Sequence, residues 1–206
     1  MGEKTSNIIN KGIKIFAVLY ALFILKQCCG IFYTKMTHMS ASDLEWVRPA
    51  SRYMHVTFRS DSGNQAQLTI LHSYVNNDTN PFYISSSKDT YEANAAYEYV
   101  VDNYGSGMDG RFSIARSLKN DSLVYNASLN KFGTWRHILL KPESIDLNGR
   151  QLENCLVVDS INGSLPPYYL EHNIEVKNPV SKFIISKDYG LVYFRYKTGE
   201  EFYRDF

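Results

Sequence analysis

Apolar and polar residues alternate along most of the chain beyond residue 52, and this period of two predicts a protein built mainly of β-strands. Two such runs, Tyr53–Arg59 and Gln67–Val75, are rich in β-branched and aromatic residues, which favour pleated structure. Between them lies Asp61–Asn64, with the sequence DSGN, whose residue types form tight turns. The two runs are therefore predicted to form an antiparallel hairpin.

The same signature continues to the end of the chain. Asn148–Gly149 is the strongest two-residue hairpin signal, and Thr198–Gly199 links the last two runs in a similar way. Both faces of these last two runs are apolar, so they are expected to be central and covered on both sides. The runs predicted as strands after residue 110 are Arg111–Leu118, Ser122–Leu129, Thr134–Leu140, Gln151–Ile161, Tyr168–Val176, Lys182–Ser186, Leu191–Lys197 and Glu200–Phe206.

One segment has a helical period instead. Within Thr90–Tyr104, apolar residues recur at steps of 3, 1, 3, 1 and 3, which places them on one face of a helix. Asp89 and Glu92 have the spacing of a capping box, and Gly105 suits the left-handed residue that ends a helix. We therefore expect an amphipathic helix that packs against the sheet, followed by a glycine-rich linker at Gly105–Gly110.

The first 34 residues have the pattern of an export segment. Ile15–Leu25 contains no charge, glycine or proline and follows a basic leader, as in a secretory signal. Extended to Ile13–Tyr33, it has 21 residues, enough for an uncleaved membrane anchor in which Lys26 reaches the far interface. A lipoprotein signal with Cys28 as the lipidated residue is the second interpretation, although Lys26 and Gln27 fit its motif poorly. A cleaved signal and a buried helix of a cytosolic protein are the remaining alternatives.

These patterns divide the chain into three parts. Residues 1–34 form the signal or anchor, residues 35–51 a short polar stalk, and residues 52–206 a β-rich domain. The expected fold is mainly β (α+β), with a curved, mostly antiparallel sheet of about eight to ten strands and one amphipathic helix. Because large open sheets tend to curl, the sheet is expected to form a half-barrel over that helix.

Composition and charge exclude some functions. Apolar residues make up 44% of the chain, which is enough for a substantial core. Residues 1–29 contain four lysines and one glutamate, which leaves 18 basic and 20 acidic residues in the remainder. That remainder has no basic stripe, so nucleic acid is not an expected partner.

Motifs for chemistry are missing from the sequence. There is no Cys-x-x-Cys, His-Glu-x-x-His or Gly-x-Ser-x-Gly, so no metal site, cofactor or catalytic residue is predicted. His55 and His72 could face each other across the first hairpin, which is more typical of a polar surface pair than of a metal site. Cys155 lies within a predicted strand and is expected to be a buried small hydrophobe.

The C-terminal third resembles a known group of proteins. The sequence LNGRQLENCLVV, followed by FIISKDYGLVYFRYKTGEEFYRDF, is similar to the closing hairpins of small exported proteins of Bacteroides-type bacteria. The resemblance covers roughly residues 145–206, and its motifs are structural, with Gly149 and Gly190 in turns. It implies a β-rich exported protein, in some members a lipoprotein, and it assigns no catalytic residue.

Together these features favour a membrane-tethered, extracytoplasmic binding or structural domain without catalysis of its own. The expected partners are the membrane, through the N-terminal segment, and a glycan, an apolar ligand or a protein. Two alternatives remain open: a periplasmic carrier of a lipid or other apolar molecule, and a cell-surface glycan hydrolase with two carboxylates in a cleft. The residues proposed to bind the ligand are the aromatic residues Tyr97, Tyr99, Tyr104, Tyr168 and Tyr169.

Overall fold

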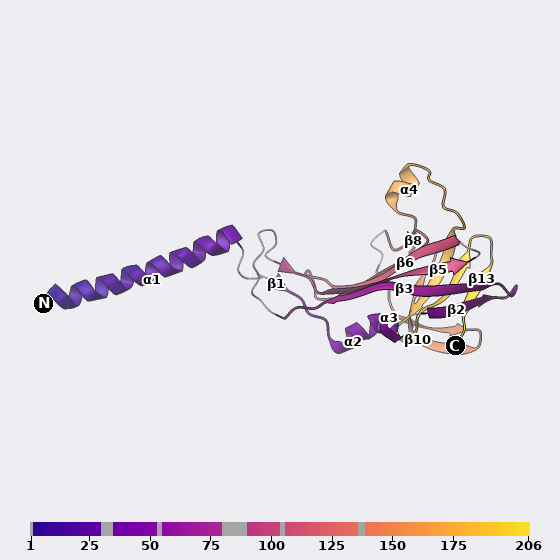
Figure 1. Cartoon of the computed structure of the whole chain (residues 1–206), viewed down its shortest axis with the longest axis horizontal. Helices are drawn as coiled ribbons and strands as arrows, with labels where there is room; N and C mark the ends of the chain where they lie inside the picture. Colours follow the sequence, from indigo (N-terminus) through magenta and orange to yellow (C-terminus); the bar gives the residue numbers. More distant parts are fainter. Residues whose placement is uncertain (1, 30–34, 53–54, 80–89, 104–105, 136–138) are drawn as a thin grey trace.

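The computed structural model describes residues 2–29, 35–52, 55–79, 90–103, 106–135 and 139–206. The chain is mainly β, with a long N-terminal helix, α1 (Gly2–Cys29), drawn as an uninterrupted rod in Figure 1. Side chains of α1 are described at positions 11–24, and its large apolar side chains there are 43% to 71% exposed. Among the described residues, no helix combines the length and the apolar character needed to cross a membrane.

The domain that follows is one large antiparallel sheet of 11 strands, in the order β8-β7-β6-β5-β3-β2-β13-β12-β11-β10-β9. It consists of two meanders that meet where β13 pairs with β2. The strands are β2 (His55–Ser60), β3 (Gln65–Asn76), β5 (Asn94–Asn103), β6 (Ser106–Arg116), β7 (Leu123–Leu129), β8 (Phe132–Gly133), β9 (Glu143–Leu147), β10 (Arg150–Val158), β11 (Val180–Ser186), β12 (Gly190–Tyr196) and β13 (Glu201–Arg204).

Smaller elements complete the fold. β1 (Lys35–Met36) and β4 (Thr90–Tyr91) form a separate parallel pair beside the large sheet. Three short turns of helix connect β1 to β2, and a fourth lies between β10 and β11. These are α2 (Ala41–Leu44), η1 (Glu45–Val47), α3 (Pro49–Arg52) and α4 (Pro167–Glu171).

The predicted hairpins are confirmed. β2 pairs with β3 across DSGN, and β12 pairs with β13 across Thr198–Gly199. In the β9–β10 hairpin, Asn148 and Gly149 have φ angles of 53° and 79°, the left-handed pair that a two-residue turn of this kind requires. β12 is buried on both faces, as expected for a central strand.

The prediction of an amphipathic helix over residues 90–104 is wrong, because its described residues form β4 and β5. In β5, Ala95, Tyr97, Tyr99 and Val101 point to the inner face at a period of two and are at most 2% exposed. Aromatic and β-branched side chains such as those of Tyr97, Tyr99 and Val101 favour strands. Residue 96, on the other face, is also buried. Because apolar residues occur on both faces of this strand, their spacing in the sequence resembles that of the apolar face of a helix.

Three further predictions of secondary structure are wrong in other parts of the chain. The segment Gly105–Gly110, predicted as a linker, is part of β6 from Ser106 onward. Tyr168–Val176, predicted as a strand, begins in α4, where Pro166 and Pro167 open a helical turn. Thr134–Leu140 was predicted as a strand, but its described residues lie outside β-structure, with β8 ending at Gly133.

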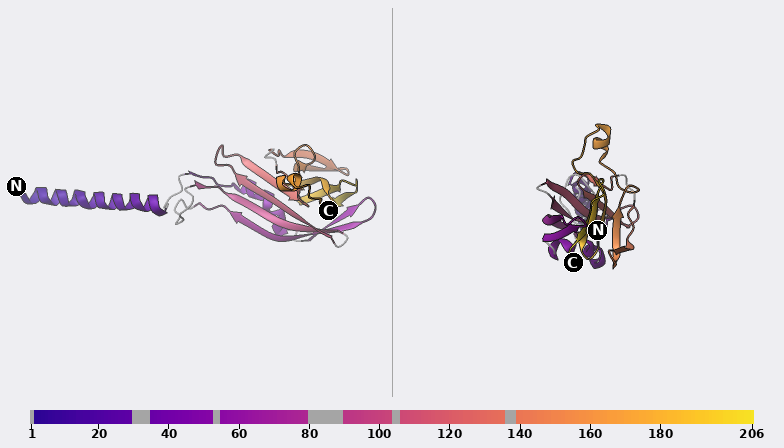
Figure 2. Two further views of the ribbon diagram at one scale, coloured as in Figure 1. Left: turned by 90° about the horizontal axis from the view of Figure 1, so that it is seen from above. Right: turned by 90° about the vertical axis from the view of Figure 1, so that its right-hand side faces the viewer.

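The sheet curls so that its two ends approach, as expected of a large sheet. In the end-on view of Figure 2, the purple strands and the orange strand lie on opposite sides, with the yellow strands between them. Gly133 in β8 exchanges backbone hydrogen bonds of 2.9 and 2.8 Å with Ser164, which follows β10. Phe132 and Phe183 meet edge to face at 6.2 Å across this closure. The interior is filled by side chains from both meanders rather than by the expected helix.

Residues 35–51, predicted as a stalk, pack onto the domain. Trp46 in η1 is 3% exposed and lies against Phe112 and Tyr125, with ring centroids 6.0 and 4.9 Å away. Met39 and Ala50 are buried in the same core. This segment therefore covers the inner face of the β5–β6–β7 region.

Candidate functional site

Successive side chains of a strand point to opposite faces of the sheet. In β5, β6 and β7, polar side chains lie on the outer face, which points away from the core. Glu98, Arg111 and Ser128 lie directly opposite one another across the three strands. The next outward row contains Ser113 and Asn126, which are also directly paired. Directly opposed side chains on one face lie about 4.5–5.5 Å apart at Cβ, so these residues form one continuous polar surface.

Two adjoining pockets on this surface form a groove, which we call the outer-face groove. The pockets have volumes of about 250 Å³ and about 290 Å³ and share Arg111, Ser128 and Trp135. The first is further lined by Ser113, Asn126, Ala127 and Thr134, and the second by Leu71, Glu98, Tyr99, Asp109, Gly110 and Lys131.

Trp135 supplies the aromatic wall of the groove. Its indole Nε1 donates a hydrogen bond of 2.9 Å to the backbone oxygen of Lys131, so the ring is fixed while 43% of the residue stays exposed. The hydroxyl of Thr134 accepts from the backbone nitrogen of Ala127 at 3.1 Å, which ties the segment after β8 back to β7. The position of Trp135 is therefore set by the turn from β7 into β8.

Arg111 lies at the centre of the groove and is held by two neighbours. Its Nη1 is 3.4 Å from a carboxylate oxygen of Glu98, and its Nη2 donates to the hydroxyl of Tyr74 at 3.1 Å. Lys131 pairs in the same way with Asp109, at 3.3 Å. Among the lining residues that the structure describes, two cations and two carboxylates balance, so these residues together carry no net charge.

Three polar side chains of the groove have no partner among the residues that the structure describes. Within the part of the chain that the structure describes, the Oγ atoms of Ser113 and Ser128 and the amide of Asn126 make no hydrogen bond to another residue. Polar atoms of this kind remain available to water or to a ligand. The combination of a fixed aromatic wall and unused polar groups is typical of a small-molecule site.

The described aromatic residues predicted to bind a ligand form two pairs, with ring centroids 5.9 Å apart for Tyr97 and Tyr99 and 6.3 Å apart for Tyr168 and Tyr169. Tyr97 and Tyr99 are 2% and 1% exposed inside the core, and burial raises the pKa of each hydroxyl well above its ordinary value. Tyr168 is 60% exposed on α4, where its ring centroid lies 4.2 Å from that of His172, and Tyr169 is half-buried beside it. Tyr104 and the side chain of Cys28 lie outside the described residues.

The histidines of the first hairpin and Cys155 were the other residues considered for metal binding or catalysis. His55 pairs with Thr69 and His72 with Glu98, so the two histidines do not face each other. No group of three or more histidine, cysteine, aspartate or glutamate residues that could bind a metal occurs in the described ranges. Cys155 is fully buried, as predicted, and burial raises the pKa of its thiol to about 11.

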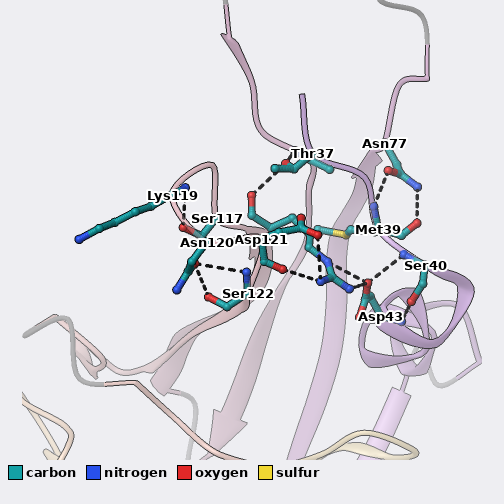
Figure 3. Close-up of polar contacts among 12 residues, drawn as sticks. Thr37, Met39, Ser40, Asp43, Asn77, Ser117, Lys119, Asn120, Asp121 and Ser122 are labelled. Carbon is teal, nitrogen blue, oxygen red and sulfur yellow. Dashed lines mark hydrogen bonds and ion pairs between the residues drawn. The ribbon is translucent and has the colours of Figure 1, made fainter. Parts of the chain in front are cut away.

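A second polar cluster, around Asp43 and Arg116, joins the segment before β2 to the sheet (Figure 3). Nη2 of Arg116 lies 2.6 Å from Oδ2 of Asp43, and Ser40 and Asp43 cap α2 reciprocally. The amide of Asn77 exchanges hydrogen bonds of 2.9 and 3.0 Å with the backbone of Met39. Thr37 Oγ1 donates to the backbone oxygen of Arg116 at 2.9 Å. These groups satisfy one another, and the cluster serves as an attachment rather than as a ligand site.

No known family model matches this chain, and no curated protein or solved structure is similar enough to count as a relative.

Proposed function

We propose that this chain is a membrane-attached binding protein, in which the β-sheet domain recognises a ligand without transforming it. The observation that carries the proposal is the outer-face groove, where Trp135 is fixed beside unused polar side chains. A largely preformed pocket with an aromatic wall and a few polar groups is how proteins recognise small ligands.

The apolar surface of α1 supports attachment to a membrane. The exposed apolar side chains between Ile13 and Ile24 point in all directions around the helix rather than along one stripe. A protein partner covers one side of a helix, whereas lipid can surround it. Lys11 and Lys14 lie before the apolar stretch, and basic residues favour the cytoplasmic side, so the domain would lie outside the cytoplasm.

The two alternative functions have less support. A carrier needs an apolar cavity inside the curled sheet, but that space is occupied by rings such as Phe194 and Phe202, which stack at 4.7 Å. A glycan hydrolase needs a carboxylic acid held in apolar surroundings. The two carboxylates of the groove, Glu98 and Asp109, are instead exposed and paired with cations. We therefore propose binding alone.

Membrane attachment is tested by separating membranes from soluble protein after expression of the full chain. We expect the wild-type chain to stay with the membranes during alkaline extraction, and Leu19→Lys to move toward the soluble fraction, since a charge in lipid is costly. Lys11→Gln is the matched control and should stay with the membranes. Protease added from outside then reports the side on which the domain lies. A soluble, native wild-type chain would contradict the attachment.

Binding is tested through the fluorescence of the chain, which contains two tryptophans, Trp46 and Trp135. Trp46 is buried, so a ligand in the groove should change the emission of Trp135. We expect one class among neutral oligosaccharides, acidic oligosaccharides, fatty acids and short peptides to change the signal and raise the unfolding temperature. Trp135→Phe should lose the fluorescence response. If no class of compound changes the fluorescence or raises the unfolding temperature, the binding function is refuted.

A further inference from the structure

We infer that the ligand of the outer-face groove is a neutral oligosaccharide. This inference rests on the binding function proposed above and names its ligand class. It follows from three properties of the groove: the aromatic wall, the chemistry of its unpaired polar groups and the balance of its charges.

The wall formed by Trp135 matches the apolar face of a sugar ring. Several C–H bonds on one face of a pyranose carry a small positive charge, and the face of an indole ring is negative. The ring of Trp135 does not need to be ordered on binding, because its Nε1 already donates to Lys131. A rigid aromatic side chain gives up little conformational entropy when it makes a contact.

The floor of the groove matches the hydroxyl groups of a sugar. Each sugar hydroxyl both donates and accepts, and the side chains of Ser113, Asn126 and Ser128 also offer both functions. Arg111 adds donors, with its position fixed by Glu98 and Tyr74. An apolar ligand such as a fatty acid would leave these groups without partners, at a cost of about 1–3 kcal/mol for each buried group.

The charges of the groove favour a neutral ligand over an acidic one. Arg111 and Lys131 are the cations among the described lining residues, and each is paired with a carboxylate. A uronic acid or a sulfated sugar would have to compete with Glu98 and Asp109 for these cations. A neutral chain can instead accept from Arg111 without displacing Glu98, because a guanidinium has five N–H donors.

The shape of the groove favours more than one sugar unit. The two pockets are each smaller than the ~300–1,000 Å³ of a site for a drug-sized molecule, and they meet at Arg111, Ser128 and Trp135. Two adjoining small pockets with a shared aromatic wall suit two linked rings better than one larger rigid molecule.

The test is a titration of the full chain, in mild detergent, with neutral di- and trisaccharides of glucose, galactose, mannose and N-acetylglucosamine. Uronate oligomers, sulfated disaccharides, a fatty acid and short peptides form the comparison set, and calorimetry measures affinity independently of fluorescence. We expect at least one neutral sugar to bind. Trp135→Ala should lower the affinity for that sugar by about tenfold or more, and Asn126→Ala should lower it by several-fold.

Tyr168→Ala is the matched control, because it removes an exposed aromatic ring on α4, outside the groove. It should leave the affinity unchanged. Asn126 lies on the surface of β7, so its variant keeps the test valid if Trp135→Ala fails to fold. Binding of only an acidic sugar, a fatty acid or a peptide would overturn the sugar assignment and leave the binding function standing. Sugar binding lost in Tyr168→Ala but kept in Trp135→Ala would overturn the groove as its site.

Discussion

The ion pair between Asp43 and Arg116 should be a main stabilising contact between the segment before β2 and the sheet, and replacing Asp43 by asparagine tests this. The side chains of Asp43 and Arg116 are 12% and 23% exposed, so solvent screens them weakly. Nη2 and Nε of Arg116 reach the same carboxylate oxygen at 2.6 and 3.3 Å. Asparagine retains an oxygen for the α2 cap but removes the charge that Arg116 contacts.

The magnitude follows from these contacts. A hydrogen bond to a charged group contributes about 1.5–3 kcal/mol, and breaking a fully buried pair costs about 3–5 kcal/mol. Arg116 keeps a hydrogen bond of 2.6 Å to the backbone oxygen of Asp121 and remains partly exposed, which reduces the loss. We therefore expect Asp43→Asn to lower the free energy of unfolding by about 2–3 kcal/mol.

The assay is urea unfolding of the full chain in mild detergent, followed by the fluorescence of Trp46, which lies in η1 directly after α2. Arg48→Gln is the matched control, because it breaks an ion pair with Glu45 whose side chains are 49% and 39% exposed. Exposed pairs contribute about 0–1 kcal/mol, so this control should change little. Equal losses in Asp43→Asn and Arg48→Gln would refute the role given to the Asp43–Arg116 pair.

The same pair predicts a pH dependence. Burial alone raises the pKa of Asp43, but hydrogen bonds from Arg116 and Ser40 outweigh it and keep the pKa below its ordinary value. A carboxylate with a lowered pKa in the folded state stabilises the protein above its unfolded pKa, about 3.9, and loses this contribution as the pH falls through the folded pKa. Below about pH 4, the stability of the wild type should therefore fall more steeply than that of Asp43→Asn. Parallel curves would contradict this.

The remaining predictions concern the core. Gly110→Ala should lower the free energy of unfolding by about 1–3 kcal/mol, because a Cβ there would lie 2.1 Å from the Tyr99 ring; an unchanged urea midpoint would contradict this. Phe194→Ala should cost about 3–5 kcal/mol by removing a fully buried ring stacked on Phe202 at 4.7 Å, and a loss below about 1 kcal/mol would show that the core is loosely packed. In a variant without the two N-terminal cysteines, Cys155 should react with iodoacetamide at pH 8 only after unfolding in urea; rapid labelling of the native chain would disprove its burial.

The hairpins were predictable from the sequence because their signals are local. The left-handed residues Asn148 and Gly149 specify a two-residue turn whatever the rest of the chain does. The turns at Asp61–Asn64 and Thr198–Gly199 also lie between clearly alternating runs. The pairing of β13 with β2, which joins the meanders, brings Phe202 beside Ser60 and has no such local signal.

The segment from residue 90 to residue 110 was mispredicted because both faces of β5 are partly covered. When both faces of a strand are buried, apolar residues also occur at odd-numbered spacings along the sequence. Over a short run, such a pattern of apolar residues fits a period of 3.6 as well as a period of 2. Tertiary contacts decide such cases: β5 pairs with β3 on one side and with β6 on the other. The glycines of Gly105–Gly110 suggested a linker, whereas Gly110 is needed in β6 for the close approach of Tyr99.

The candidate site was missed for the same reason. Glu98, Arg111 and Ser128 are neighbours only because β5, β6 and β7 are adjacent in this register. If residues 90–104 form a helix, as the sequence pattern predicts, no contact between Glu98 and Arg111 is expected. Trp135 is one of two tryptophans and lies in the predicted strand Thr134–Leu140, but nothing in the sequence indicates that Trp46 is buried and Trp135 exposed.

The structure also explains why two of the tyrosines proposed as ligand-binding residues, Tyr97 and Tyr99, are buried in the core. Because the sheet curls, the inner faces of the two meanders pack against each other. Large inward side chains, including Tyr97 and Tyr99, fill the core between them. The outward residues of the same strands are freed from packing, and their polar groups remain open to solvent. In a curled sheet with a filled interior, a ligand has access only to the outer face, the edges or the loops. An exposed aromatic residue fixed on the outer face, such as Trp135, is therefore a better indicator of binding here than the number of aromatic residues in the chain.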